Sequence, residues 1–456
     1  MMPIPRQPLS SPPMPSDPIS SPLMPRRRLL RLLALAGGSA GLAACGRPGG
    51  RGDGRRELNV WTLDLAPRFN NYLGGVIAAW ERDHPAERVR WTDVPWGSVE
   101  RKLLASVFAR TAPDLVNLNP PFAANLASKG GLLDLAPLVG AEAAASYLPA
   151  IWQAGGQDGA QFAIPWYLTA RIGMANRRLL AEAGSGAPPR RWREVPAWAE
   201  AVRRRTGRYA LFMTVVPEDS AELLETLVQM GVQLLDGRRR AAFNSPAGRE
   251  AFRFWSELYR QGLLPREVVS QGFRRAIELY QAGDLALVAT GPDFLRNLQT
   301  NAPGIAADTA PYPPITGEDG AANVAVMNLV VPRQSAMAAE AVGFALFLTN
   351  AANQLAFAEE ARVLPSSRQA LSQLEASLAR PAGGDPASQL VEQARLLSAR
   401  TLQQARVLVP AIPGIKRLQA IVYTQLQRAM LDQTDSDRAL AEAEREWNRY
   451  AEARWP

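Results

Sequence analysis

The chain has 456 residues, with 51 Lys and Arg against 43 Asp and Glu, and a net charge of +8 at neutral pH. It holds one cysteine, Cys45, and one histidine, His84. So few thiols and imidazoles nearly exclude Ser-His-Asp and Cys-His catalytic sites and histidine-rich metal sites. The basic excess is mild, and its short arginine clusters adjoin no nucleic-acid recognition motif, so we expect no nucleic-acid partner and no cofactor.

The first 44 residues predict an export signal. Arg26 to Arg31 is cationic, and residues 32–44 form an apolar run of 13 residues that ends in small side chains. This order is typical of a secretory signal peptide. The run is shorter than the roughly 20 apolar residues of a membrane-spanning helix. We therefore expect residues 1–44 to be a cleaved signal peptide, with Met1 or Met24 as its start.

The stretch from Leu42 to Cys45 resembles the lipobox of bacterial lipoproteins. This resemblance implies cleavage before Cys45 and lipidation of its thiol. The exported protein would then be a membrane-anchored lipoprotein of the periplasm or cell surface. The arginines before the apolar run also resemble a twin-arginine motif, so both the Sec and the twin-arginine export routes remain open. Residues 45–56 hold no side chain that packs well, which predicts a flexible tether.

Strands and helices alternate along the body that follows the tether. In the first half we expect strands at 58–62, 89–94, 114–119 and 161–166, with helices at 72–82, 99–110 and 123–129. This alternation predicts an α/β fold with a parallel sheet and helices on both of its faces. The second half continues with strands at 171–176 and 209–214, helices at 220–230 and 246–261, and an almost entirely helical region from 393 onward. His84 stands just before Pro85, so we expect it to cap a helix rather than to bind a metal.

Eight short phrases follow one another in a recognisable order: Trp61-Thr62, Ala112 to Val116, Gly130 to Leu135, Phe162 to Trp166, Pro188 to Trp192, Phe243 to Pro246, Tyr280 to Leu287 with Gly291-Pro292, and Leu364 to Ser366. In this order they resemble the solute-binding proteins of bacterial carbohydrate ABC transporters, the group that includes maltose-binding protein. The likeness extends from about Leu58 to Trp447.

This resemblance implies a two-lobed periplasmic-binding-protein fold, in which each lobe is a sheet flanked by helices and the C-terminal region is helical. The N-terminal lobe would hold residues 57–168 and 313–358, and the C-terminal lobe residues 169–312 and 359–456. The chain would cross between the lobes near 168–171, 312–314 and 358–362. Such proteins are monomers that close about a hinge on their ligand and then dock on a permease, which works with a cytoplasmic ATPase.

A sugar presents hydroxyl groups and a C–H face, so its site needs aromatic rings, carboxylates and amides. In open α/β sheets, ligands bind beyond the carboxyl ends of the strands. The residues that follow the predicted strands are therefore candidate ligand contacts: Trp61, Asp64, Asn117, Asn119, Trp166, Tyr167, Glu218, Asp219, Gly291 and Asp293. Asn328 joins them because an amide inside an apolar strand must either find a backbone partner or face the cleft.

The predicted function is thus a receptor, and not an enzyme, for a neutral sugar, polyol or small glycoside. Asp293 stands where the family often has an aromatic residue, and Met327-Asn328 replaces a commoner Gly-Gly, which favours a small, highly hydroxylated ligand. Two other functions remain open. One is an exported glycosidase with Asp64 and Glu218 as its carboxylate pair, and the other is a lipoprotein adaptor that binds no small molecule.

Overall fold

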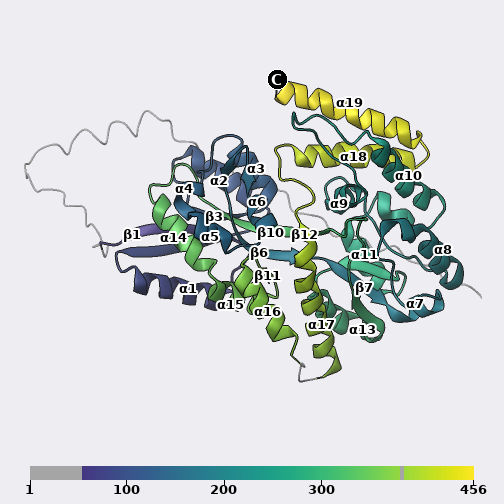
Figure 1. The fold of residues 1–456 in the computed structure, drawn as a ribbon, viewed down its shortest axis with the longest axis horizontal. Coiled ribbons are helices and arrows are strands. Elements are labelled where there is room, and N and C mark those ends of the chain that lie inside the picture. The colour runs from purple at the N-terminus through teal and green to yellow at the C-terminus, as the bar shows by residue number, and fades with distance from the viewer. Residues whose placement is uncertain (1–53, 381–384, 456) are drawn as a thin grey trace, which may run out of the picture. The chain divides into compact units, whose positions relative to one another are not determined.

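The computed structural model describes residues 54–380 and 385–455, so the predicted signal peptide and Cys45 lie outside the described residues. Two β-sheets organise the described part of the chain (Figure 1). The larger sheet has seven strands: β1 (Arg56–Leu63), β2 (Glu87–Val94), β3 (Leu115–Leu118), β6 (Ile164–Ala170), β10 (Ala322–Val330), β11 (Leu364–Pro365) and β12 (Ala405–Arg406). The smaller sheet has three strands: β7 (Ile172–Asn176), β8 (Leu287–Thr290) and β9 (Thr309–Tyr312).

The larger sheet mixes parallel and antiparallel pairs in the order β11-β6-β10-β3-β1-β2, with β12 beside β10. β1 pairs in parallel with β2 and β3, as the alternation of strands and helices predicts. β10 instead runs antiparallel to β3 and to β6. The expectation of a parallel sheet is therefore right for β1, β2 and β3. It is wrong for β6 and β10, and for the smaller sheet, whose strand pairs are both antiparallel. β10 arrives from the smaller sheet rather than through a helical crossover from a neighbouring strand, and this permits the antiparallel direction.

Helices pack against the larger sheet and around its edges: α1 (Asn70–Asp83), α2 (Val99–Phe108), α3 (Pro120–Ala127), α4 (Ala136–Val139), α5 (Ala141–Ala145), α6 (Pro149–Gln153), α14 (Ala338–Leu348), α15 (Ala351–Ala361) and α16 (Arg368–Leu378). A small hairpin joins β4 (Gly156–Gln157) to β5 (Ala160–Gln161).

Within the described ranges, no single helix has the length and apolar character to cross a membrane. The pair α14 and α15, bent by 60°, meets those two criteria only when taken together.

The remaining helices surround the smaller sheet or connect its parts: α7 (Arg177–Glu182), α8 (Val195–Thr206), α9 (Glu222–Gln229), α10 (Pro246–Arg260), α11 (Phe273–Gln281), α12 (Phe294–Asn301), α13 (Pro303–Asp308), α17 (Pro386–Thr401), α18 (Ile415–Met430) and α19 (Ser436–Arg454). Three 3₁₀ turns complete the order: η1 (Trp192–Glu194), η2 (Arg266–Val269) and η3 (Leu402–Gln404). α10 begins where the sequence indicates, because Ser245 accepts a hydrogen bond from the Gly248 amide at 3.1 Å and Pro246 occupies the first turn.

The strand expected at 209–214 is wrong. The segment forms a single isolated parallel bridge, Tyr209 with Leu285, and no regular strand. Its side chains from Ala210 to Met213 are nevertheless buried one after another. A short apolar run of this kind indicates burial rather than a particular backbone form. Burial here is satisfied by an irregular segment whose end is tied by the Gln427 side chain to the Val215 carbonyl, at 2.9 Å.

The chain passes between the two sheets through very short connections. β6 of the larger sheet ends at Ala170 and β7 of the smaller sheet begins at Ile172, which leaves Arg171 alone between them. The return runs from the end of β9 to the start of β10. Crossings between the lobes are predicted near 168–171 and 312–314, and the lobe boundaries stay a prediction. The third crossing was expected at 358–362, but β11 and β12, which follow it, still pair within the larger sheet.

Each sheet has its own apolar core. The core at the smaller sheet gathers residues from 172–315 and again from 391–451. Three clusters at the larger sheet draw on 58–170 and 322–405. α18 and α19 lie side by side, and both contact α10 (Figure 1). Trp447 of α19 is completely buried and donates from Nε1 to the Arg239 carbonyl at 2.9 Å. The division into two cores agrees with a two-lobed fold, and the residue boundaries of the lobes stay a prediction.

Candidate functional site

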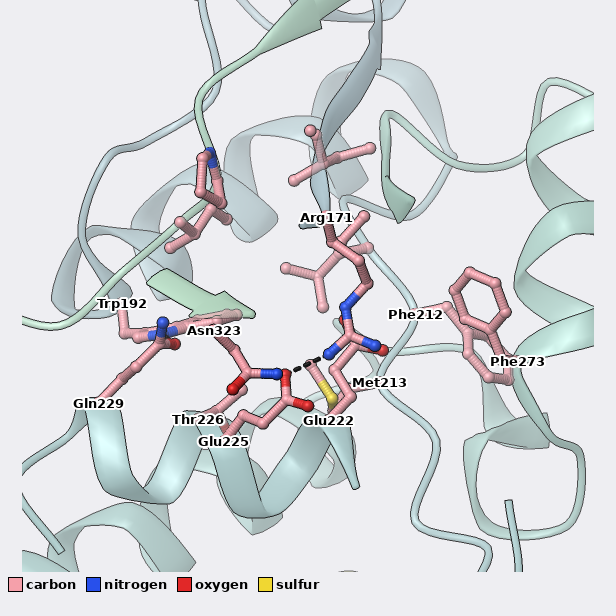
Figure 2. Close-up of a pocket in the computed structure, with 16 residues that line it drawn as sticks. Arg171, Trp192, Phe212, Met213, Glu222, Glu225, Thr226, Gln229, Phe273 and Asn323 are labelled. Atoms are coloured by element: carbon pink, nitrogen blue, oxygen red, sulfur yellow. Dashed lines mark hydrogen bonds and ion pairs between the residues drawn. The ribbon is translucent and has the colours of Figure 1, made fainter. Parts of the chain in front are cut away.

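A pocket lies where the chain passes between the two sheets. Arg171, from the β6–β7 connection, lines it together with Pro314 and Ile315 from the β9–β10 connection. The other walls come from η1, α9, α11, the segment before α9 and the strands β7, β8 and β10, and Figure 2 shows residues of these walls. The cavity has a volume of about 70 Å³. Because both connections border it, we take this cavity, called the Arg171 pocket below, as the candidate functional site.

Helix α9 supplies most of the polar side chains of the Arg171 pocket. Glu222, Glu225 and Gln229 recur at three- and four-residue intervals, so they lie on one face of the helix. The other face buries three leucines in the core: Leu223, Leu224 and Leu227. The apolar face therefore fixes the helix, and the polar face is turned toward the cavity (Figure 2).

One guanidinium faces two carboxylates in this pocket. Arg171 donates a hydrogen bond from Nη2 to Glu225 Oε2. Glu222 is 8% exposed, and its carboxylate makes no hydrogen bond or close ion pair with any residue of 54–380 or 385–455. Burial raises the pKa of Glu222 to about 7, although the charge of Arg171 opposes this rise. Burial would lower the pKa of Arg171, but attraction to Glu222 and Glu225 outweighs it, so the guanidinium pKa lies above its ordinary value.

Aromatic side chains form the apolar walls. Trp192 is held in place because its Nε1 donates to Gln229 Oε1 at 2.7 Å. Gln229 in turn donates from Nε2 to the Ala321 carbonyl at 2.8 Å, which ties α9 to the β9–β10 connection. Phe212 and Phe273 also line the cavity (Figure 2). Such walls suit the C–H face of a hydroxylated molecule, and the α9 side chains suit its hydroxyl groups.

The C-terminal helix α18 holds the segment that leads into α9. Gln419 Nε2 donates to the Ser220 carbonyl at 3.1 Å, and the Tyr423 hydroxyl donates to the same oxygen at 2.7 Å. Gln427 binds the Val215 carbonyl further upstream. These contacts span about 200 residues of sequence, so the position of the pocket carboxylates depends on the packing of the C-terminal helices.

Several residues predicted as ligand contacts lie on the larger sheet. Trp61 is partly buried in β1, with Lys102 Nζ 4.7 Å from its ring centroid. Asp64 is exposed, and its Oδ2 accepts from the Trp96 amide at 2.8 Å. Asn119 serves as the N-cap of α3. These three side chains are at or near the protein surface, where a solute has access to them.

Four other predicted contacts are buried. Trp166 is completely buried and stacks on Phe357 with ring centroids 5.1 Å apart, and Tyr167 packs on the same ring at 5.4 Å. Asn117 donates from Nδ2 to the Asn328 carbonyl at 3.1 Å, and both residues are buried. Trp166 and Tyr167 also contact each other, with ring centroids 5.2 Å apart. The packing of Trp166 and Tyr167 offers no free ring face in this conformation.

The predicted residues of the second half lie near the ends of helices. Glu218 and Asp219 are exposed just before α9, and Asp219 Oδ2 accepts from the Phe273 amide at 2.9 Å. Gly291 and Asp293 precede α12, where Asp293 is exposed and makes no capping hydrogen bond. None of the eleven predicted residues lines the Arg171 pocket. The pocket residues carried a signal that was missed: carboxylates at i and i+3 on a helix whose other face is apolar, and a charged residue between two buried strands.

The described residues contain no group of three or more His, Cys, Asp or Glu side chains placed to hold a metal ion. His84 is the C-cap residue of α1, as expected. Its ring stacks on Trp80 with centroids 3.5 Å apart, and its Nδ1 lies 3.0 Å from the Trp80 carbonyl oxygen.

A more open groove of about 620 Å³ lies on the other side of Trp192 and Gln229, which border both cavities. α10 and residues 317–319 form its further walls. Two ion pairs cross its rim, Arg193 with Glu318 and Arg406 with Asp319. The groove is larger than the Arg171 pocket, but it borders only one of the two connections between the sheets.

Comparisons with known proteins identify relatives along almost the whole described chain. The profile of the family described as "Bacterial extracellular solute-binding protein" matches residues 66–355. A solved structure from Synechococcus sp. MITs9220, described as a "putative oligosaccharide periplasmic-binding protein", is 65% identical, covers 88% of this chain and 100% of that one, and has a TM-score of 0.81. The Synechococcus protein was also solved in complex with zinc.

More distant relatives share the fold. The cyclic alpha-maltosyl-1,6-maltose binding protein from Arthrobacter globiformis is 20% identical, with a TM-score of 0.74, over 87% of this chain and 99% of that one. A "putative binding protein" from Brucella abortus (strain 2308) is 21% identical over 391 residues, 85% of this chain and 91% of the relative. The two-lobed fold that the sequence predicts is thereby confirmed, and the chain belongs to the bacterial extracellular solute-binding proteins.

Proposed function

We propose that this protein is a receptor that binds a neutral sugar, polyol or small glycoside between its two lobes and delivers it to an ABC importer. The observation that carries this proposal is the family match, together with a 65% identical relative described as oligosaccharide-binding. The Arg171 pocket supports it, because carboxylates, an amide and aromatic walls converge where the chain passes between the sheets.

The proposed mechanism is closure of the lobes on the solute. A cavity of about 70 Å³ is well below the roughly 300 Å³ at which ligand pockets begin, so a sugar ring needs room beyond the pocket itself. We propose that exposed candidates such as Asp64, Glu218 and Asp293 supply further contacts from the strand and helix ends. A ligand that touches both lobes favours the closed state by its greater affinity for it.

Ligand binding should appear as thermal stabilisation of the exported chain. We expect one member of a panel of glucose, maltose, sucrose, trehalose, sorbitol and glucosylglycerol to raise the melting temperature. At 100 times its dissociation constant, such a ligand adds about 2.7 kcal/mol to the free energy of unfolding. Differential scanning fluorimetry with each compound, at several concentrations, makes this measurement.

Product analysis of the same mixtures distinguishes the rival functions. A solute that stabilises the protein and is recovered intact supports the receptor. Hydrolysis of a glycoside in the mixture would favour the glycosidase, with Asp64 and Glu218 as the first carboxylates to replace. No stabilisation by any member of the panel would favour an adaptor without a small ligand.

We further propose that Cys45, outside the described residues, carries the lipid that anchors the protein. Replacing it with serine (Cys45→Ser) should move the exported protein from the membrane fraction to the soluble fraction, because a hydroxyl does not take the thioether-linked lipid. Cell fractionation and mass spectrometry of the N-terminal peptide measure both effects. An unmodified Cys45 in wild-type protein purified from membranes would contradict the anchor.

A further inference from the structure

Glu222 stands out among the side chains of the Arg171 pocket because it is buried without a partner. The residue is 8% exposed and lines the cavity, yet its carboxylate has no hydrogen-bond donor among residues 54–380 and 385–455. A buried carboxylate is normally paired or strongly hydrogen-bonded, since loss of hydration disfavours its charge. A group placed in this way is suited to accept hydrogen bonds from something that enters the cavity.

The surrounding charges leave Glu222 uncompensated. Arg171 faces it from the β6–β7 connection, but this guanidinium is already bonded to Glu225, one turn along the same helix. Asp219 adds a second negative charge from the segment before α9. Tyr423 of α18 also faces Glu222, but its hydroxyl donates to the Ser220 carbonyl and not to the Glu222 carboxylate. One positive charge therefore serves two pocket carboxylates.

The size of the cavity limits what reaches Glu222. About 70 Å³ is several times the room that one water needs, and far less than a pocket that encloses a whole ligand. A hydroxyl-bearing substituent, such as a hydroxymethyl or glyceryl arm, matches this space. The rest of the solute would remain outside, against the aromatic walls.

We propose that Glu222 accepts the hydroxyl groups of a solute arm in its ionised form only, so that binding of a neutral solute expels a proton from the Arg171 pocket. This inference rests on the proposed function and names the part of the solute that the site selects. A carboxylic acid keeps one proton as a donor, whereas the carboxylate offers only acceptors to the solute hydroxyls. Hydroxyl donation stabilises the charged form and lowers the pKa of Glu222 in the complex.

The direction of the pH effect follows from this linkage. In the free protein the pKa of Glu222 is about 7, so near pH 6 most molecules hold a proton that the solute must displace. Affinity should therefore rise with pH, by up to about tenfold per unit below pH 7, and become constant above it. Replacing Glu222 with glutamine (Glu222→Gln) keeps the shape of the side chain and removes its titration.

The test uses the exported full chain and the panel of six solutes named above. For the solute with the largest thermal shift, isothermal titration calorimetry at pH 6 and pH 8 measures affinity, and two buffers of different ionisation enthalpy measure proton release. We expect wild-type affinity to rise at least fivefold from pH 6 to pH 8, with net proton release at pH 6.5. The Glu222→Gln variant should bind more weakly at pH 8 and show neither effect.

Two further variants test whether the pH dependence of binding comes from the Glu222 carboxylate. Glu200, an exposed residue of α8 that pairs with Arg204, provides the control: Glu200→Gln should keep the wild-type pH profile. Glu222→Asp keeps an ionisable group and should retain proton release at reduced affinity. Equal wild-type affinity at both pH values would overturn this inference while the receptor function stands. Absence of binding by any solute at either pH would remove the receptor function and this inference with it.

Discussion

Replacement of Trp447 by alanine is expected to lower the free energy of unfolding by about 3–5 kcal/mol, the usual cost of deleting a fully buried large aromatic side chain. The indole of Trp447 is completely buried, and its Nε1 donates a hydrogen bond to the Arg239 carbonyl. The alanine variant leaves this carbonyl without that donor. Urea unfolding followed by circular dichroism gives the change.

The expected loss extends to the binding site. α19 packs on α18, and α18 holds the Ser220 carbonyl through Gln419 and Tyr423 just before α9 begins. Solute affinity should therefore fall in the Trp447→Ala protein even where it remains folded. Trp96 is a suitable control, since it is 43% exposed and its replacement by alanine should change stability by about 0.5 kcal/mol or less. Similar losses for the two variants would contradict the assigned role of α19.

The second large effect is a gain in stability. Between its ordinary pKa of 4.5 and its folded value of about 7, Glu222 binds more protons in the folded chain than in the unfolded chain. The free energy of unfolding therefore decreases as pH rises through this range, and the penalty is complete above pH 7. The Glu222→Gln variant lacks this penalty. At pH 8 it should be more stable than wild type by up to about 3 kcal/mol, because one pKa unit corresponds to about 1.4 kcal/mol.

Urea unfolding of both proteins at pH 5 and pH 8 measures this difference. The curves should lie close together at pH 5 and separate at pH 8, with the glutamine variant unfolding at the higher urea concentration. A variant that gains stability and loses affinity would mark Glu222 as a binding residue that is retained in spite of its cost to folding. A difference that is the same at both pH values would contradict a raised pKa.

Much of the fold follows from local sequence signals. The β1 and β2 strands and helix α10 were predicted close to their observed bounds because alternation, helical periodicity and the Ser245-Pro246 cap all act over a few residues. The direction of β10 and the irregular backbone at 209–214 depend on partners far along the chain. The local sequence pattern does not indicate that β10 pairs with β3 and β6, or that α18 supports the segment at 209–214.

The candidate site shows the same limit. A rule based on strand ends selected Trp166, which the fold uses to fill the core against Phe357. The same rule passed over Glu222 and Arg171, because their meeting depends on the angle of α9 against the connection between the sheets. Asn328 was recognised as an amide in need of a partner, and the structure supplies Asn117 as a neighbour whose side chain binds its backbone.

Arg171 also bears on which changes of length the chain tolerates. Connections between elements usually accept insertions, because they run over the surface. This one separates two strands by a single residue, so the side-chain alternation of β6 continues in step into β7. One added residue would turn every side chain of β7 to the opposite face of the smaller sheet, and all five residues of this strand are buried, so each would lose its present packing. The length of the β6–β7 connection is thus fixed by the alternation of side chains along the two strands. Natural variation in length is expected in other connections.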